Sequence, residues 1–385
     1  MTALDADVAV VGVGSMGSQA LWQLSQRGVS AIGIEQFAPG HDRGAGHGES
    51  RIIRSCYQEG PEYVPLVLDA FRLWRELAAE SGAGILTENG ALYVGRPAVG
   101  YLDGVRRTGD AWGLRYQLLD HEETARRFPQ HRLRPDEASF LDLQAGFVRP
   151  ELAVRSAAAC AERRGARLLT GVRVQHFREA SDHVEITTSS GVVRTARAIV
   201  STGAWTGKVL PQAGLRLRVE RQVMFWFRAP HPEEFHPDRF PIFIRERGGD
   251  RTWYGFPTLD GSTVKAAIHH DGADADPDHL DREIHAADAE PVAALVAAAL
   301  PDLDPDPVRG VACMYTNTED GHFVLGHAPG SERLILLGPM AGHGFKFASA
   351  VGRVGADLAV DGATDLPIAP FAPGRFAPAG TPADT

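Results

Sequence analysis

Cysteine and lysine are both scarce in this chain of 385 residues. The three cysteines, Cys56, Cys160 and Cys313, are odd in number and form no Cys-x-x-Cys pair. That pattern argues against a disulfide framework and a structural zinc site, and we expect no bound metal. Only three of the 39 basic residues are lysines, namely Lys208, Lys265 and Lys346. A chain that uses arginine for nearly all its surface cations keeps lysine where a compact ammonium group is needed.

Long apolar runs and basic clusters are also missing. The longest alanine-rich apolar stretch, Pro291 to Leu300, is too short to cross a bilayer. With 49 acidic against 39 basic residues and no polybasic segment, nucleic acid and anionic membranes are not expected partners. The first residues carry no signal-type segment and the last are not Ser-Lys-Leu, so we expect a cytoplasmic protein.

The N-terminal region has the pattern of a dinucleotide-binding unit. An apolar run from Asp7 to Val13 leads into Gly12-Val-Gly14-Ser15-Met16-Gly17, then into a helical pattern and a second apolar run, Val29 to Ile34. Glycines at these positions permit a tight turn, close approach of a pyrophosphate and close helix packing. Glu35 follows at the spacing of an acid that binds ribose hydroxyls. The motif predicts a bound dinucleotide but does not distinguish NAD from FAD.

Two further segments could contact such a cofactor. Residues 41–50 form a glycine-rich, polar loop that could wrap a large ligand, and Arg51-Ile-Ile-Arg54 follows it. If that segment is helical, the two arginines share one face. A strand ending in Thr202-Gly203-Ala204-Trp205 could place a turn against the nucleotide.

The rest of the chain predicts a two-domain α/β protein, because 385 residues exceed what one core usually covers. Helices are expected at 61–79, 150–164 and 345–358, and strands at 168–174, 184–188, 192–201, 219–228, 252–256, 263–269, 308–315 and 334–338. We assign 1–85, 151–215 and 320–363 to a discontinuous Rossmann-like domain. Residues 86–150 and 216–319 form a substrate domain on a mixed or antiparallel sheet. The Pro- and Ala-rich segment 364–385 is expected to be a loosely held tail.

The lysines differ in their surroundings. Lys208 fits no phosphate-binding loop and is expected on the surface. Lys265 lies in an apolar run whose strand pattern places it on the same face as His269, so a functional ammonium and a buried salt bridge both remain open. Lys346 follows Gly342-His-Gly344-Phe345 at an expected helix start, where an anion could bind.

Several motifs together resemble one enzyme family. They are Gly12 to Gly17, His47-Gly-Glu-Ser-Arg-Ile-Ile-Arg54 with Tyr57, Glu59 to Pro65, Tyr254-Gly-Phe-Pro257, and the segments around Cys313 and Lys346. The chain resembles, from about Asp7 to Asp361, the monomeric sarcosine oxidase and N-methyltryptophan oxidase family, which also includes D-amino acid oxidase and glycine oxidase. The resemblance implies a monomer that oxidises a secondary amino acid to an imine with FAD and reduces O2 to H2O2.

The resemblance also implies residue roles. Cys313 would form a thioether to the 8α-methyl group of FAD, while Arg54 and Lys346 would hold the substrate carboxylate. Lys265 would hold a water at the flavin and speed the reduction of O2. Further implied contacts with the flavin or the substrate are Arg51, Tyr254, Tyr315, His269, Gly342, Glu35, Ser50, Val174, Gly12, Gly14, Ser15, Met16, Gly17, Gly344 and Phe345.

Some features depart from the family pattern or leave other functions open. We interpret residues 244–250 as a longer and more charged loop, Ile244 stands where methionine is common, and Gly46 replaces one of a histidine pair. These changes argue against sarcosine as the best substrate but not against the reaction, and sarcosine, N-methyl aromatic amino acids, proline and pipecolate all stay open. One alternative is a flavoprotein subunit that passes electrons to a partner protein. An NAD-dependent dehydrogenase would leave Cys313 and Lys346 without a role, and no G-x-S-x-G or H-E-x-x-H motif supports a hydrolase.

Overall fold

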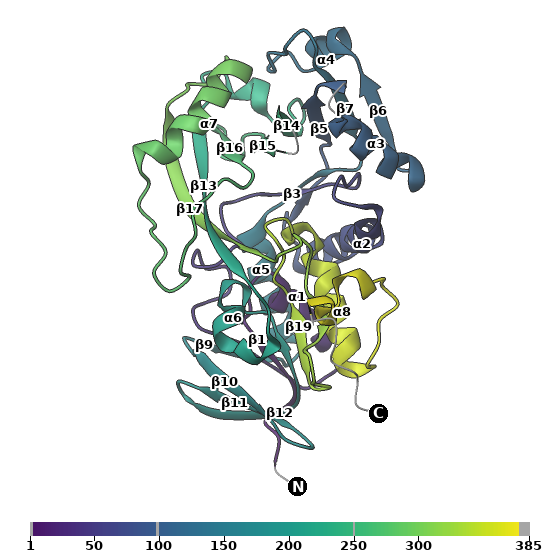
Figure 1. Ribbon diagram of the computed structural model, residues 1–385, viewed down its shortest axis with the longest axis vertical. Coiled ribbons are helices and arrows are strands. Elements are labelled where there is room, and N and C mark those ends of the chain that lie inside the picture. The colour runs from purple at the N-terminus through teal and green to yellow at the C-terminus, as the bar shows by residue number, and fades with distance from the viewer. Residues whose placement is uncertain (1–2, 98–99, 249–250, 377–385) are drawn as a thin grey trace.

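The computed structural model describes residues 3–97, 100–248 and 251–376 and contains three β-sheets. The first sheet forms the lower part of the molecule in Figure 1 and has the order β10-β11-β12-β1-β2-β9, with β19 and β18 joined at β12. Its centre is parallel, because β1 pairs with both β2 and β12 in parallel. The strand bounds are β1 Ala6–Val11, β2 Ala31–Glu35, β9 Arg167–Thr170, β10 Val174–Glu179, β11 Val184–Thr188, β12 Gly191–Val200, β18 Leu325–His327 and β19 Leu334–Leu337.

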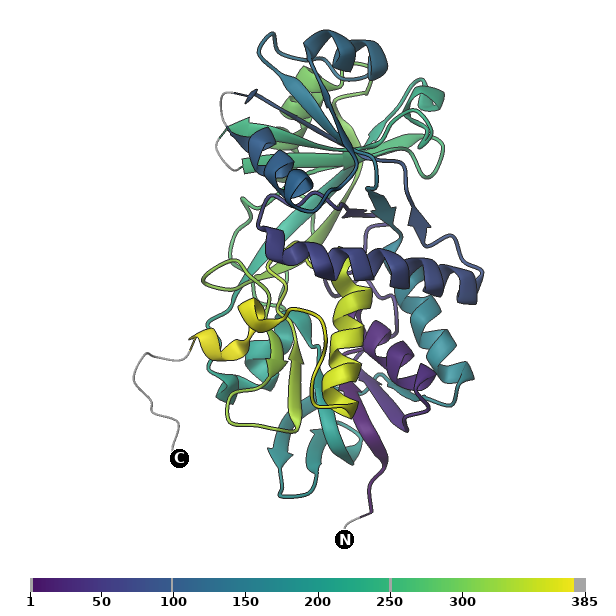
Figure 2. The same ribbon diagram turned by 90° about the vertical axis from the view of Figure 1, so that its right-hand side faces the viewer.

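Helices pack on this sheet and on one another. The helices are α1 Ser15–Gln26, α2 Val64–Ser81, α3 Tyr101–Ala111, α4 His121–Arg127, α5 Pro150–Arg163, α6 Thr206–Val209, α7 Ala286–Ala299 and α8 Ala348–Val360. Side chains of α1, α2, α5 and α8 share one buried core with β1, including Val8, Leu21 and Trp74. Figure 2 shows α2 crossing the end of α8, between the lower and upper parts of the molecule.

The second sheet forms the upper part and has the order β17-β13-β16-β15-β14-β5-β7-β6. Adjacent strands in this sheet run antiparallel, except β14 and β5, which run parallel. Its strands are β5 Ala91–Gly95, β6 Tyr116–Leu119, β7 Ala138–Asp142, β13 Arg218–Arg228, β14 Ile242–Gly248, β15 Arg251–Phe256, β16 Thr263–Ile268 and β17 Pro307–Asn317. A small sheet of β3 Arg51–Ile53, β8 Gly146–Val148 and β4 Leu86–Thr87 completes the two-domain α/β fold.

Several local predictions were wrong. The expected strand at 168–174 is two strands, because Gly171 takes a positive φ of 70° between β9 and β10. The expected charged loop at 244–250 is strand β14 as far as Gly248, and residues 249–250 lie outside the described part. Two of its charges are buried in ion pairs: Arg245 with Glu137 at 2.7 Å and Glu246 with Arg96 at 2.8 Å.

The segment from Arg51 to Arg54 is also not helical. Arg51 begins strand β3, and residues three apart on an extended segment point to opposite sides. Arg51 therefore contacts Cys313 at 3.6 Å, whereas Arg54 pairs with Glu59.

Residues 364–376, expected to be loosely held, instead pack on the body of the molecule. Phe371 is fully buried against Tyr63 and Phe323, and Arg375 binds Asp320 at 2.7 Å. Residues 377–385 of the expected tail lie outside the described part. Within the described ranges, no helix is long and apolar enough to cross a membrane, and no cluster of metal-ligating side chains occurs.

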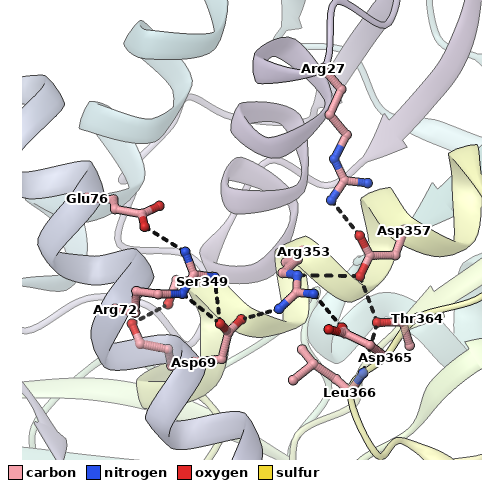
Figure 3. A network of polar contacts seen from close by, with 11 residues as sticks. Arg27, Asp69, Arg72, Glu76, Ser349, Arg353, Asp357, Thr364, Asp365 and Leu366 are labelled. Carbon is pink, nitrogen blue, oxygen red and sulfur yellow. Dashed lines mark hydrogen bonds and ion pairs between the residues drawn. The ribbon is translucent and has the colours of Figure 1, made fainter.

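A polar network ties three helices to this C-terminal segment (Figure 3). Asp357 on α8 accepts hydrogen bonds from Arg27, just after α1, at 2.5 Å and from Thr364 at 2.7 Å. Arg353, also on α8, donates to Asp69 on α2 at 3.1 Å. Because Asp357 is 7% exposed, its carboxylate relies on these partners rather than on water.

Replacing Asp357 with alanine is expected to lower the free energy of unfolding by about 1–3 kcal/mol, because Arg27 and Thr364 lose a buried acceptor. Urea unfolding followed by circular dichroism measures the change. Asp365→Ala is the matched control, since that carboxylate is 73% exposed and should contribute less than about 0.5 kcal/mol. Equal effects of the two substitutions would contradict the assignment.

Candidate active site

One cavity of about 970 Å³ joins the glycine turn of the first sheet to the inner face of the second. It brings together sixteen of the residues that the sequence singled out: Gly12, Gly14, Ser15, Met16, Glu35, Arg51, Arg54, Val174, Tyr254, His269, Cys313, Tyr315, Gly342, Gly344, Phe345 and Lys346. The turn at Thr202 to Trp205 lines it too. Three predicted residues do not line this cavity, namely Gly17, Ser50 and Lys265.

The glycine turn is shaped for close approach of a ligand. Gly12 has a φ of 84°, and a Cβ there would lie 2.6 Å from the carbonyl oxygen of Ser201. A Cβ on Gly17 would lie 1.9 Å from the Gly12 carbonyl oxygen, which explains why this residue supports helix packing rather than the cavity. At Gly14 nothing lies within 4 Å, so the space beside the backbone is open. This is the arrangement that a pyrophosphate requires.

Helix α1 begins at Ser15 with no side-chain cap and no acid in its first turn. Its N-terminal N–H groups are therefore available for a phosphate, which the helix dipole also favours. Glu35 at the end of β2 is 3% exposed and accepts hydrogen bonds from the backbone N–H groups of Val13, at 2.8 Å, and Phe37, at 3.0 Å. The site thus fits the diphosphate and ribose of a dinucleotide.

Cys313 on β17 is distinguished from the other thiols by its charged surroundings. It is 2% exposed, Arg51 Nη2 lies 3.6 Å from its Sγ, and the ring of His47 is nearby. Burial by itself raises the pKa of the thiol, but His47 and Arg51 outweigh that effect and lower it to about 7. Burial instead raises the pKa values of Cys56 and Cys160. Cys313 is therefore the thiol that reaches its reactive thiolate form most readily.

Two cations meet where the small sheet approaches the start of α8. Arg54 lies over the Tyr57 ring at 4.3 Å and pairs with Glu59 at 2.5 Å. Lys346 Nζ donates to the carbonyl oxygen of His343 at 2.7 Å and lies 3.4 Å from the Tyr57 hydroxyl. Burial, and then the charge of Arg54, lower the pKa of Lys346 well below its usual value. The negative charge of an incoming carboxylate would offset both effects and raise the pKa of Lys346.

Aromatic side chains form the opposite wall. His269 Nδ1 lies 3.2 Å from the Tyr315 hydroxyl, and the Tyr254 ring meets the His269 ring edge-on, at 75°, with the ring centres 6.3 Å apart. Burial, and then His270, lower the pKa of His269 well below 6.5. A neutral imidazole can accept a hydrogen bond and adds no charge beside a neutral amine.

Lys265 on β16 is 2% exposed and points to the loop that precedes β3. Its Nζ donates to the carbonyl oxygens of Gly48 at 2.8 Å and Ser50 at 2.6 Å, and it lies 4.0 Å from the centre of the Phe256 ring. Burial, and then the charge of Arg51, lower the pKa of this lysine well below its usual value. Two backbone carbonyls therefore hold it in place, rather than the salt bridge that the sequence left open.

A family model described as FAD dependent oxidoreductase matches residues 7–358 of this chain. The chain belongs to the FAD dependent oxidoreductase family. It is 37% identical to the monomeric sarcosine oxidase of Streptomyces avermitilis over 97% of this chain and 98% of that protein. It is 30% identical to the N-methyl-L-tryptophan oxidase of Salmonella dublin over 96% and 99% of the two chains.

Solved structures agree with the fold of this FAD dependent oxidoreductase. The open form of NikD, described as an unusual amino acid oxidase essential for nikkomycin biosynthesis, superposes with a TM-score of 0.84. It is 25% identical and covers 96% of this chain and 98% of its own. The L-proline dehydrogenase of P. horikoshii shares the fold with a TM-score of 0.83 at 21% identity, covering 97% of this chain and 98% of its own.

Several residues in this oxidoreductase site were not singled out from the sequence. His47 acts on the Cys313 thiol, Glu59 occupies one edge of Arg54, and His343 Nδ1 lies 2.5 Å from the Tyr57 hydroxyl. Glu151 on α5 accepts the backbone N–H of Gly48 at 2.6 Å and so fixes the loop before β3. All but Glu151 lie within the motifs described above, beside the residues to which those motifs assign a role.

The affinity of the free site for a simple carboxylate such as acetate is expected to fall as pH rises. Lys346 has a lowered pKa, and a bound anion favours its charged form, so binding takes up a proton. Above the pKa of Lys346 in the free protein, Kd should rise about tenfold per pH unit. Glu59, with a pKa lowered to about 2, and His343, lowered to about 3, do not titrate near neutrality.

Flavin absorbance between pH 6 and 10 follows acetate binding. Lys346→Met should weaken binding and abolish its pH dependence, whereas Lys208→Met, on the exposed surface, should leave both unchanged. A pH dependence that survives in the Lys346→Met protein would contradict this role.

Proposed function

We propose that this protein is an FAD-dependent oxidase of secondary amino acids, N-methylated or cyclic, which produces an imine and H2O2. The observation that carries the proposal is that one cavity joins a dinucleotide-binding turn, the activated Cys313 thiol and the Arg54–Lys346 pair. The relatives named as sarcosine and N-methyl-L-tryptophan oxidases support the same substrate class.

The chain's own residues bind and orient the substrate. Arg54 and Lys346 hold its carboxylate, because two cations offset the free energy of removing an anion from water. Tyr254, Tyr315 and neutral His269 surround its nitrogen, which must be unprotonated to lose electrons. The backbone of Gly342, whose added Cβ would lie 2.5 Å from the Tyr315 ring, closes the pocket tightly at that side.

Gly12, Gly14, Ser15 at the helix start and Glu35 would hold the diphosphate and ribose of FAD, with Val174 beside them, while Gly17 lets the helix pack against the turn. Arg51, Gly344 and Phe345 would lie toward its ring, with Arg51 held by the carbonyl oxygen of Ser50 at 2.9 Å, and Cys313 would be joined to the 8α-methyl group. When bound, FAD supplies the redox chemistry, taking two electrons from the amine and returning them to O2. The amine loses two hydrogens to become an imine, and O2 gains two to become H2O2.

Lys265 assists the oxygen reaction as an ammonium group: the carbonyl oxygens of Gly48 and Ser50 that accept its hydrogen bonds favour its charged form against burial, and that charge stabilises developing negative charge. We propose that the enzyme acts as a monomer with the two domains assigned above. A flavoprotein that hands electrons to a partner would need no such lysine.

A peroxide-release assay of the purified, flavin-containing protein tests the function. Sarcosine, N-methyl-tryptophan, proline and pipecolate are each supplied under air, and H2O2 is coupled to a peroxidase dye. We expect release with at least one of them, with O2 consumed in equal amount. Substrate-dependent bleaching of the flavin without O2 consumption would instead favour the electron-transferring alternative.

A further inference from the structure

A buried carboxylate braces one end of the cavity beyond Tyr315. Glu220 on β13 pairs in register with Tyr315 on β17 and is 1% exposed. It accepts hydrogen bonds from Asn317 Nδ2 at 2.7 Å, Gln222 Nε2 at 2.5 Å and the backbone N–H of Gly272 at 2.8 Å. Arg218 lies 3.3 Å away. Glu220 is thus saturated with donors and acts on its neighbours rather than on a ligand.

Glu220 decides which way the amide of Asn317 points. Because an ionised carboxylate can only accept, the amide nitrogen must face Glu220 and the oxygen must face away. Asn317 lines the cavity, and its Oδ1 is buried without a hydrogen-bond partner among the described residues. A buried acceptor without a donor is unfavourable unless a ligand or water supplies one.

His270 adds a second acceptor at the same place. Its Nδ1 lies 3.4 Å from Glu220, and in the tautomer that carries its proton on Nδ1, toward this carboxylate, Nε2 is an acceptor. The ring also lines the cavity, with its centre 5.2 Å from that of Tyr315. The loop is held rigidly against β13: His270 and Asp271 have positive φ values of 61° and 83°, and a Cβ on Gly272 would lie 1.7 Å from the Arg221 carbonyl oxygen.

We propose that Asn317 and His270 form a subsite for the substrate's side chain that binds a hydrogen-bond donor. The proposal rests on the proposed function, in which the reacting amine lies beside His269 and Tyr315. Asn317 is two residues beyond Tyr315 on the same face of β17, a separation of about 6–7 Å. A side chain of four or five bonds spans that distance. The preferred substrate is therefore a secondary amino acid whose side chain ends in an amide or ammonium N–H.

Four Nα-methyl amino acids of similar length test the subsite: those of lysine, glutamine, glutamate and norleucine, each as both enantiomers. The readout is kcat/KM for peroxide release. We expect the lysine or glutamine compound to exceed norleucine and glutamate by at least about tenfold, because only they supply an N–H to the two acceptors. A higher kcat/KM for the lysine compound than for the glutamine compound would show that the preferred side chain ends in a cation, attracted by the Glu220 carboxylate. A higher kcat/KM for the glutamine compound would show that it ends in a neutral donor.

The ratio of kcat/KM for the better of the lysine and glutamine compounds to kcat/KM for the norleucine compound should fall to about one in Asn317→Leu. It should also fall, but less far, in Glu220→Gln, which frees the Asn317 amide to turn. Asp274→Asn, on the same loop but 77% exposed, is the matched control and should keep the ratio. A ratio near one in the unaltered enzyme, or one that survives Asn317→Leu, overturns the subsite while sarcosine oxidation still supports the function. No oxidation of any N-methyl amino acid, sarcosine included, overturns both.

Discussion

Replacing Lys265 with methionine is expected to slow reoxidation of the substrate-reduced enzyme by O2 at least about 100-fold, with a much smaller effect on its reduction by substrate. The ammonium group is fixed by the carbonyl oxygens of Gly48 and Ser50 and shielded by Phe256. It therefore needs no reorganisation when negative charge develops on O2. Methionine keeps the length of the side chain but removes its charge.

Stopped-flow spectroscopy separates the two half-reactions: anaerobic mixing with substrate, then mixing of the reduced protein with O2. Lys208→Met is the matched control, because Lys208 is exposed and paired with Asp276 and Asp278. Thermal unfolding of the Lys265→Met protein shows whether the two unpaired carbonyls weaken the fold. Equal slowing of both half-reactions would indicate a structural role, and an unchanged oxygen rate would refute the assignment.

The sequence predicted the parallel nucleotide-binding unit well because its signals are local. The glycine turn, the apolar strands beside it and Glu35 lie within one short segment, and β1, α1 and β2 form where expected. It failed where tertiary contacts decide. Arg51 to Ile53 become a strand because β8 pairs with them, and Phe371 is buried because Tyr63 and Phe323 offer an aromatic surface far away in the chain.

In the site, too, local patterns could be predicted and tertiary contacts could not. Strand alternation correctly placed Lys265 in β16. Its partners, Gly48 and Ser50, lie more than 200 residues earlier, and no local pattern indicates them. Likewise no local pattern shows which charges surround each of the three cysteines. Only the fold brings His47 and Arg51 to Cys313. Residue types could be read from motifs, but the charges acting on them could not.

Replacing Cys313 with serine is expected to abolish covalent attachment of the flavin completely. In the unaltered protein, precipitation with acid should leave the yellow chromophore in the pellet, on the peptide that contains Cys313. In the Cys313→Ser protein it should pass entirely into the supernatant. The reason is that the lowered thiol pKa of about 7 makes a substantial fraction of Cys313 a thiolate at neutral pH, whereas a serine hydroxyl is not ionised there.

The other two cysteines provide matched controls for that experiment. Cys56 and Cys160 are buried, and burial raises their pKa values, so Cys56→Ser and Cys160→Ser should leave the flavin attached. Attachment forms a carbon–sulfur bond with loss of one hydrogen from the thiol and one from the methyl group; the oxidised flavin can take up both, and O2 then reoxidises it with release of H2O2. Adding FAD to flavin-free protein in air should therefore give attachment with about one H2O2 released per attached flavin, and none from the Cys313→Ser protein. Chromophore that leaves the unaltered protein on acid treatment would remove the thioether from the proposal, while the glycine turn, Glu35 and the start of α1 would still bind FAD without a covalent bond.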